Sequence, residues 1–387
     1  MRLAGQLGVA LVVVCSKQAK LDQVAQRVAT TPAARSLIVQ ISGRWTHSAF
    51  PKRTSDLVFR DASAGRTSDL SLKRNLGLLL ARLHGWNKIA FVDDDITITR
   101  TDGIARLAGQ LDRYQVAGMR AGDFPDNSVV CHARRVAGFW QDVFVTGAVL
   151  GVHCGDLPLS YFPDIYNEDW FFFAKEAAAR KLPRVGEARQ AEYDPFESPE
   201  RARREEFGDL LAEGLYALFG EEGGSMHFDD RLRGATRRYW ERFIEARREV
   251  IEETQTALSR FTNGNSENDR VSAVLASLAA AENQLNVAIT SELCVNFLNA
   301  WRDDLDDWQR FTNRVSNVGS TGEAMDSLGL NNWIWAEFGA PQVESSSMSK
   351  SVHISAWRPR PNLRRRSNRS RSGKNWRSPV GSKPRAW

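Results

Sequence analysis

Cysteine is scarce in this chain of 387 residues, and none of the four cysteines has a metal-like C-x-x-C spacing: Cys15, Cys131, Cys154 and Cys294. This pattern argues against a disulfide-rich or zinc-finger protein and favours buried thiols in a reducing compartment, so we expect a cytoplasmic protein. No stretch is apolar for long enough to span a bilayer, so no transmembrane segment is expected. The apolar run before Cys15 is short and ends in valines, which favours a first β-strand over a signal peptide.

Acidic residues are absent between Trp357 and Trp387, where 11 Lys and Arg lie. Residues 1–356 carry 41 basic against 47 acidic side chains, so the net charge of +5 is due to this C-terminal segment. Residues 341–387 have the Ser-, Arg- and Pro-rich composition of a disordered basic tail. Such a tail can contact nucleic acid or an anionic membrane by charge alone. Because no folded nucleic-acid motif accompanies it, a solvated tail is the simpler interpretation.

The first 200 residues predict an α/β domain. Apolar runs at 9–15 and 36–41 enclose a helical pattern at 19–29, which is a βαβ unit of the kind that opens nucleotide-binding sheets. We therefore expect a mixed, mostly parallel sheet flanked by helices. A short strand at 56–60 and Gly-punctuated strands from 116 to 152, including residues 128–132, should extend it.

The region from 201 to 340 is predicted to be helical. After a helix that ends near Leu218, two long patterns at 231–262 and 269–300 repeat apolar residues at helical spacing, and residues 263–268 form the loop between them. The simplest interpretation of this region is a helical C-terminal extension.

Three consecutive carboxylates, Asp93, Asp94 and Asp95, follow the apolar run 89–92. A short apolar run with a polar break predicts a buried strand of a parallel sheet, and open α/β sheets bind ligands beyond the carboxyl ends of such strands. Crowded carboxylates repel one another unless a cation joins them, and Mg²⁺ or Mn²⁺ prefers carboxylate and phosphate oxygens. Asp93 and Asp95 are therefore candidate ligands of a metal ion that binds a diphosphate. The alternative is a solvated acidic turn.

A strong helix pattern at 69–84 precedes the acidic stretch, with Gly85 as its C-cap. Lys73, Arg74 and Asn75 lie in its first half. Cations early in a helix oppose its dipole, which suggests an anion nearby, although a solvated helix face is the alternative.

Glu168 and Asp169 lie between aromatic residues, ahead of a helix that starts near Trp170. Burial beside aromatic rings favours a carboxyl group that can take up a proton, as a general base must. Helix capping by the same acidic residues is an equally good interpretation.

Together these motifs resemble glycosyltransferases of the GT-A fold, especially the large inverting bacterial class. Members of that class carry a βαβ unit, an Arg-Asn-x-Gly helix, a D-x-D strand end and a later acidic pair. The corresponding residues here are Arg74-Asn75-Leu76-Gly77, Asp93-Asp94-Asp95 and Glu168-Asp169. The resemblance covers about residues 8 to 195.

The resemblance implies a nucleotide-sugar donor and an acceptor hydroxyl of unknown identity. Asp93 would lie by the ribose or the metal and Asp95 would ligate Mn²⁺ or Mg²⁺, beside Asp94. Arg74 with Lys73 or Arg66, and Asn75, would lie on the nucleotide side. Asp169, next to Glu168, would be the base that deprotonates the acceptor. If Asp169 is not placed as a base, a retaining mechanism stays open. Candidates for a further metal ligand are His132, His153 and His227.

Two features depart from the family. The second strand ends in Ile41-Ser42-Gly43 in place of the usual acidic residues, and the Q-x-x-R-W sequence of processive synthases is absent, which argues against a polymerising membrane enzyme.

Other functional interpretations of the same residues stay open. Residues 93–97 also fit the D-x-D-x-T sequence of haloacid-dehalogenase-like phosphatases, in which the first Asp is the nucleophile, with Lys175 and Asp229-Asp230 as loosely fitting partners. A nucleotidyltransferase would need a Gly-rich loop after the first strand, and residues 15–18 lack glycine. A non-catalytic sugar-nucleotide-binding protein is the alternative outside enzymes.

Overall fold

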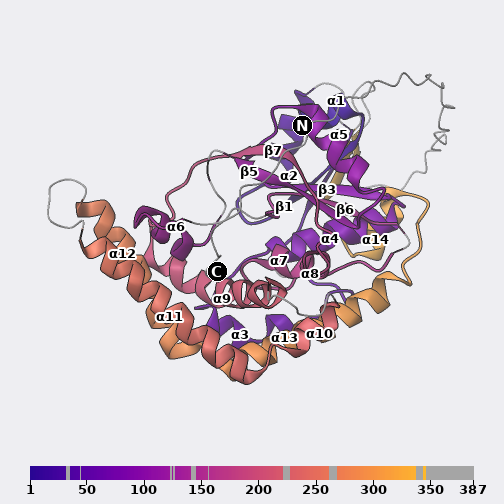
Figure 1. Ribbon diagram of the computed structural model, residues 1–387. Helices are drawn as coiled ribbons and strands as arrows, with labels where there is room; N and C mark the ends of the chain where they lie inside the picture. Colours follow the sequence, from indigo (N-terminus) through magenta and orange to yellow (C-terminus); the bar gives the residue numbers. More distant parts are fainter. Residues whose placement is uncertain are drawn as a thin grey trace, which may run out of the picture.

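The protein is a mixed α/β structure with two mixed sheets. The computed structural model describes residues 1–31, 35–43, 45–122, 124, 127–140, 145–155, 157–220, 227–260, 268–336 and 343–345. Three long helices, α11 (Arg237–Ser259), α12 (Asn268–Ala288) and α13 (Ser291–Thr312), curve along the edge opposite the sheets, and α9 (Pro199–Gly220) lies between them and the sheets (Figure 1).

The first sheet is built on the predicted βαβ unit, which is confirmed. Strands β1 (Ala10–Cys15) and β2 (Arg35–Gln40) are parallel and are joined through α2 (Leu21–Ala29). Two late strands extend the sheet: β8 (Trp333–Ala336) pairs antiparallel with β2, and β9 (Val343–Ser345) pairs antiparallel with β8. The expectation that residues 201–340 are only helical, with a tail from 341, is therefore wrong at these two strands. The rest of the predicted tail, 346–387, lies outside the described residues.

The second sheet has the order β3-β6-β5-β7-β4. Its strands are β3 (Lys88–Val92), β4 (Ile96–Thr97), β5 (Val116–Gly122), β6 (Val149–His153) and β7 (Arg184–Gln190). β3 lies at an edge and pairs antiparallel with β6, and Ala90 and Val92 are exposed. The prediction of a buried strand in a parallel sheet at 89–92 is therefore wrong in direction and burial. β7, which sequence reasoning missed, pairs parallel with β5. The expectation of a mostly parallel sheet is wrong, because among the described residues only β1–β2 and β5–β7 are parallel pairs and the other strand pairs are antiparallel.

Two predicted strands are helices because a side chain caps each first turn. Residues 57–62 form α3 (Leu57–Ala62), where the Asp56 carboxylate accepts a hydrogen bond from the Val58 amide. Residues 129–136 form α6 (Val129–Val136), where the Ser128 hydroxyl accepts one from the Cys131 amide. Short polar residues at the N-cap satisfy amides that have no partner within the helix.

The remaining helices follow the predicted order. The pattern at 69–84 is α4 (Leu70–Leu83), and Gly85 beyond it has a positive φ of 64°. The acidic pair begins α7 (Glu168–Phe172), which α8 (Ala174–Ala178) follows directly. The pattern at 269–300 is interrupted after Ala288, because the Thr290 hydroxyl accepts a hydrogen bond from the Leu293 amide and starts α13. The other helices are α1 (Arg2–Leu7), η1 (Arg53–Ser55), α5 (Thr101–Gln110), α10 (Phe228–Arg233) and α14 (Thr321–Ser327). The predicted loop at 263–267 lies outside the described residues.

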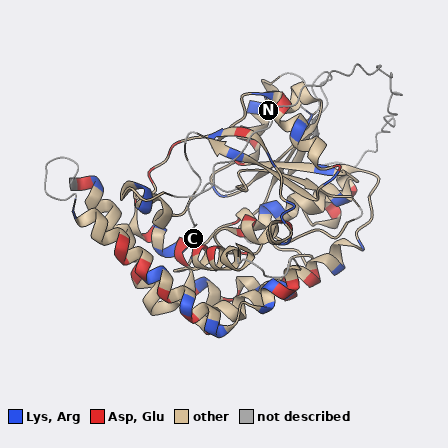
Figure 2. Ribbon diagram, viewed as in Figure 1, with Lys and Arg blue, Asp and Glu red and all other residues tan. Residues whose placement is uncertain are grey.

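Helix α9 is buried between the sheets and the outer helices. Gly214 lets it approach α11 so closely that a Cβ there would lie 2.4 Å from Cζ3 of the fully buried Trp240 ring. Lys, Arg, Asp and Glu are interspersed along the outer helices (Figure 2). Among the described residues, none of the helices combines the length and the apolar character that crossing a membrane requires.

We expect Gly214→Ala to lower the free energy of unfolding by about 1–3 kcal/mol, because the added methyl group overpacks a rigid contact. Gly109→Ala is the matched control in the last turn of α5, where a Cβ meets nothing within 4 Å. It should be neutral or stabilise by up to about 1 kcal/mol. Urea unfolding of the two variants measures both effects, and equal stability of Gly214→Ala and the parent would contradict the close contact.

Candidate functional site

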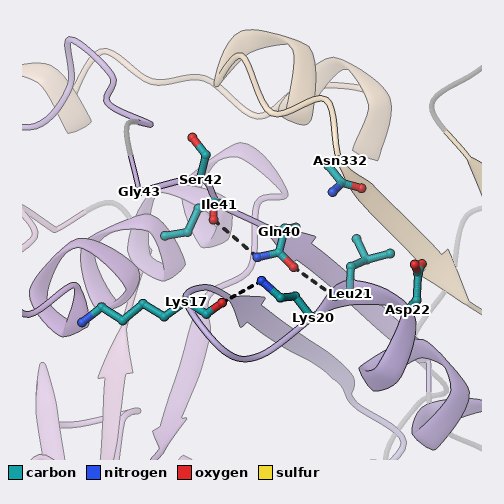
Figure 3. A pocket seen from close by; sticks show the side chains of 9 residues that line it. All are labelled: Lys17, Lys20, Leu21, Asp22, Gln40, Ile41, Ser42, Gly43 and Asn332. Atoms are coloured by element: carbon teal, nitrogen blue, oxygen red, sulfur yellow. Dashed lines mark hydrogen bonds between the residues drawn. The ribbon is translucent and has the colours of Figure 1, made fainter.

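A cavity of about 500 Å³ opens at the carboxyl ends of the parallel strands β1 and β2 (Figure 3). Its wall combines the turn after β1, the first turn of α2, the end of β2 and the residue before β8, and the lining residues are Lys17, Lys20, Leu21, Asp22, Gln40, Ile41, Ser42, Gly43 and Asn332. Ligands of α/β sheets bind at this end of parallel strands. Two lysines and several amide groups make the wall suitable for an anionic, hydrogen-bonding ligand.

The side-chain amide of Gln40 connects the segments that form this wall. Its Oε1 accepts a hydrogen bond from the Leu21 amide at 3.0 Å, and its Nε2 donates to the Cys15 carbonyl at 3.2 Å. The ends of both strands and the start of α2 are thereby fixed relative to one another.

Lys17 connects the cavity with the start of α4. Its Nζ lies 3.8 Å from Oδ1 of Asp69, and Nζ of Lys73 lies 3.2 Å from the same atom. Partial burial raises the pKa of Asp69, but the hydrogen bond from Ser16 and the charge of Lys73 outweigh it and lower the pKa overall. The predicted nucleotide-side residue Lys73 therefore shares the Asp69 carboxylate with Lys17 of the cavity wall.

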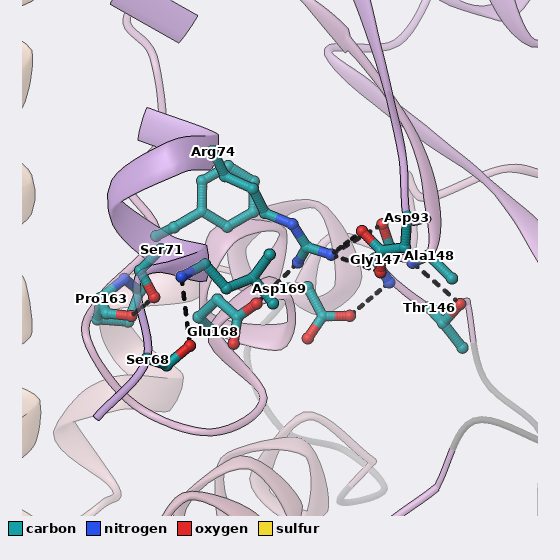
Figure 4. A network of polar contacts seen from close by, with 12 residues as sticks. Ser68, Ser71, Arg74, Asp93, Thr146, Gly147, Ala148, Pro163, Glu168 and Asp169 are labelled. Atoms are coloured by element: carbon teal, nitrogen blue, oxygen red, sulfur yellow. Dashed lines mark hydrogen bonds and ion pairs between the residues drawn. The ribbon is translucent and has the colours of Figure 1, made fainter. Parts of the chain in front are cut away.

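Arg74, one residue on, joins two of the acidic motifs that the sequence singles out (Figure 4). Its Nη2 donates to both carboxylate oxygens of Asp93, at 2.9 and 3.0 Å, and its Nη1 donates to Oε1 of Glu168 at 2.8 Å. Only 5% of Arg74 is exposed. Burial lowers the pKa of Arg74, but the charges of Glu168, Asp93 and Asp169 outweigh this effect and raise the pKa above its usual value. The guanidinium is therefore permanently charged.

Asp169 lies near the same guanidinium. Its Oδ2 accepts a hydrogen bond of 2.5 Å from the Gly147 amide, and 8% of the residue is exposed. A Cβ at position 147 would lie 2.6 Å from Nη1 of Arg74 and 2.7 Å from Cβ of Asp169. The absence of a side chain at Gly147 is therefore a condition for this arrangement.

Glu168 has a second positive neighbour. Nη2 of Arg66 lies 4.0 Å from Oε2 of Glu168, and Nη1 of Arg66 donates to Oδ1 of Asp164 at 3.3 Å. Glu168 is therefore held between two arginines, and its role in the network is to anchor them.

The three carboxylates after β3 have different surroundings. Asp93 faces Arg74, Asp94 is exposed, and Oδ2 of Asp95 accepts a hydrogen bond of 3.2 Å from Nε2 of Gln190. Burial raises the pKa of Asp93; the charge of Arg74 opposes this, whereas the charges of Glu168 and Asp95 add to it. The upward shift is thus due first to burial, and the two neighbouring carboxylates add to it.

Asn75 has a structural role. Its Nδ2 donates to the Phe162 carbonyl at 2.8 Å and its Oδ1 accepts from the Phe162 amide at 3.0 Å, and the residue is buried. Both polar atoms of the side-chain amide thus hold the loop before α7. In this conformation they are used within the protein, and the predicted contact of Asn75 with a nucleotide is not formed by them.

A divalent cation would fit this site only with ligands from outside the protein. Among the described residues there is no group of three or more His, Cys, Asp or Glu side chains arranged to hold a metal ion. Asp93 and Asp95 interact electrostatically, and 30% of the Asp93 side chain is exposed. Mg²⁺ is commonly held by one or two carboxylates together with substrate phosphates and water, which is compatible with this pair.

Sequence reasoning missed Gly147, Asp164, Gln190 and the cavity-lining residues of α2 and β2. Gly147 within Thr-Gly-Ala could have been found as a small residue directly before a strand. Asp164 and Gln190 carry no local pattern, because they reach the site through the fold.

Removing the guanidinium tests the network. We expect Arg74→Met to lower the free energy of unfolding by about 3–5 kcal/mol near pH 8, because buried carboxylates lose their cation. Without Arg74 the pKa of Asp93 rises further above its unfolded value, so the defect should shrink as the pH falls and the carboxyl group takes up a proton. Arg106→Met, at an exposed arginine of α5, is the control. Urea unfolding at pH 5 and pH 8 measures the difference, and a pH-independent defect would contradict the assignment.

Comparison with protein-family models, with curated proteins and with solved structures finds no match for this chain.

Proposed function

We propose that the protein is a glycosyltransferase that moves a sugar from a nucleoside-diphosphate donor to an acceptor hydroxyl. The observation that carries the proposal is the Arg74 network. Asp93 after β3 and the Glu168-Asp169 pair of α7 are far apart in the sequence, yet they surround one guanidinium. These are the positions at which the resemblance to GT-A enzymes requires a donor-side and an acceptor-side carboxylate.

The cavity at β1 and β2 is the proposed nucleotide site. Its position beyond two parallel strands suits a base and ribose, and Lys17, Lys20 and Lys73 suit phosphates. From this cavity a donor would extend past Lys73 toward Asp93, which brings its sugar next to the acidic pair.

Asp169 is the proposed base. Its Oδ2 is held by the Gly147 amide, and the carboxylate would accept the proton of the acceptor hydroxyl. As the acceptor oxygen bonds to the anomeric carbon, the bond from that carbon to the diphosphate oxygen breaks, and its electron pair leaves with the nucleoside diphosphate. Glu168 is bound to Arg74 and, in this proposal, keeps the guanidinium in place beside Asp169.

Mn²⁺ or Mg²⁺ is the proposed cofactor, with Asp95 and Asp93 as its protein ligands. Bound there with the diphosphate, it would neutralise negative charge on the leaving group. Asp95 and Glu168 are negative neighbours of Asp93, and this proximity of carboxylates supports a cation at this place.

Donor binding is tested by thermal shift with nucleoside diphosphates and sugar nucleotides, each with and without Mn²⁺. A ligand at one hundred times its dissociation constant stabilises the native state by about 2.7 kcal/mol. We expect one nucleotide series to raise the melting temperature, and metal alone to have little effect because, in this proposal, the diphosphate supplies part of the ligand set. Asp95→Ala should remove the metal-dependent part, and Asp102→Ala, at an exposed carboxylate of α5, should not.

If no nucleotide shifts the melting temperature, the donor site is wrong. Hydrolysis of p-nitrophenyl phosphate that is lost in Asp93→Asn would then favour the phosphatase. Nucleotide binding without turnover would favour a non-catalytic binding protein.

The role of Asp169 is tested by turnover. Asp169→Asn should lower kcat by about 10²–10⁴-fold, the usual contribution of a general base, and leave donor affinity unchanged. Glu168→Gln keeps an oxygen that accepts from Arg74, so its kcat should fall less. Transfer of radiolabelled sugar and donor titration measure the two quantities. Near-normal turnover of Asp169→Asn would remove it as the base.

A further inference from the structure

The loop that delivers the acidic pair is tied to α9 at Asn167, the residue before Glu168. Asn167 has a left-handed backbone conformation, with φ 61° and ψ 35°, and its Nδ2 donates to Oδ1 of Asp209 at 3.1 Å. The left-handed region is uncommon for residues other than glycine, and asparagine is among those that tolerate it. The side chain of Asn167 is thus used as a tether to α9 while its backbone turns the chain into α7.

A buried cluster holds Asp209 in turn. Its Oδ2 accepts a hydrogen bond of 2.6 Å from Nη2 of Arg247, which projects from α11, and the same guanidinium binds Glu206 and Glu213 of α9. Arg247 and Asp209 are 1% and 4% exposed. Burial raises the pKa of Glu206 to about 7, although the charge of Arg247 opposes the shift. Each of the two Asp209 oxygens therefore has one defined donor, and the carboxylate is fixed from both sides.

Two further contacts fix the same loop on α9. A Cβ at Gly208 would lie 2.3 Å from the Tyr166 carbonyl oxygen, so the helix backbone approaches the loop as closely as glycine permits. About two turns further along α9, the Tyr216 hydroxyl donates to the Trp170 carbonyl at 3.1 Å, and the centroids of the two rings are 4.5 Å apart. The start of α7 is thus attached to α9 before and after the acidic pair.

We propose that Asp209 is a positioning residue, which through Asn167 sets where the Glu168 and Asp169 carboxylates lie. The inference rests on the proposed glycosyl transfer and adds a role for the helical region: α11 and α9 form the support against which the base is oriented. A displacement of a reacting group by about 1 Å can cost about a hundredfold in rate.

The test compares two variants with a matched control. Asn167→Gly keeps a residue that favours the left-handed conformation and removes only the tether, and Asp209→Asn leaves one acceptor oxygen for two donors. Glu213→Gln weakens another Arg247 contact on the same helix, but the contacts of Glu213 are to Arg247 and to Cys131 of α6, away from α7. We expect both test variants to lower kcat by about a hundredfold with KM for the donor little changed, and the control to keep its kcat.

Equal loss of kcat in all three variants, following their melting temperatures, would overturn the proposal in favour of a merely structural cluster. Retained kcat in both test variants would also overturn it. If the parent protein transfers no sugar at all, the proposed glycosyl transfer is wrong, and the positioning role of Asp209 is then tested by hydrogen exchange instead. The Trp170 amide, which donates to the Asn167 carbonyl at 3.0 Å, should exchange faster in the two test variants than in the control, and unchanged exchange would overturn the tether.

Discussion

The ion pairs of Arg74 are the interaction on which the candidate site depends. A buried guanidinium is tolerated only when carboxylates surround it, and buried carboxylates are tolerated only when a cation joins them. Asp93 and Glu168 contact the Arg74 guanidinium directly, and Asp169 lies close enough to interact with its charge, so the cation and the carboxylates stabilise one another. The strand end at Asp93, the helix start at Glu168 and helix α4 are therefore held together by one group, and movement of any one of the three would break a buried ion pair.

The elements of this site were largely predictable from the sequence, because each has a local pattern. Leucines at helical spacing predict α4, and the apolar run before Asp93 predicts β3. The partners were not predictable. That Arg74 binds Asp93 and Glu168, or that Gly147 must be glycine, depends on packing between segments up to about a hundred positions apart. The GT-A resemblance, the metal and the catalytic role of Asp169 stay predictions.

The wrong assignments have physical reasons. Residues 57–62 and 129–136 contain β-branched and apolar residues in short runs, and a capping side chain at Asp56 or Ser128 decides for a helix. β3 was expected to be buried, but one face of the sheet is open to solvent at this strand, so the alternate residues Ala90 and Val92 are exposed. β8 was not predicted, because it follows a long helical region and a strand of four residues has little periodicity of its own.

Strand β8 also has a consequence for the order in which the chain can fold. In the finished sheet, Ser36 faces Ala336, so the partner of β2 is made some 300 residues after β2 itself. During synthesis from the N-terminus, the backbone amides and carbonyls along that side of β2 have no strand to pair with until Trp333–Ala336 has left the ribosome. An open strand edge is a template for pairing with other chains, and contacts of such long sequence separation form slowly. The half of the protein with the proposed nucleotide cavity is thus the first to be synthesised and among the last to be completed.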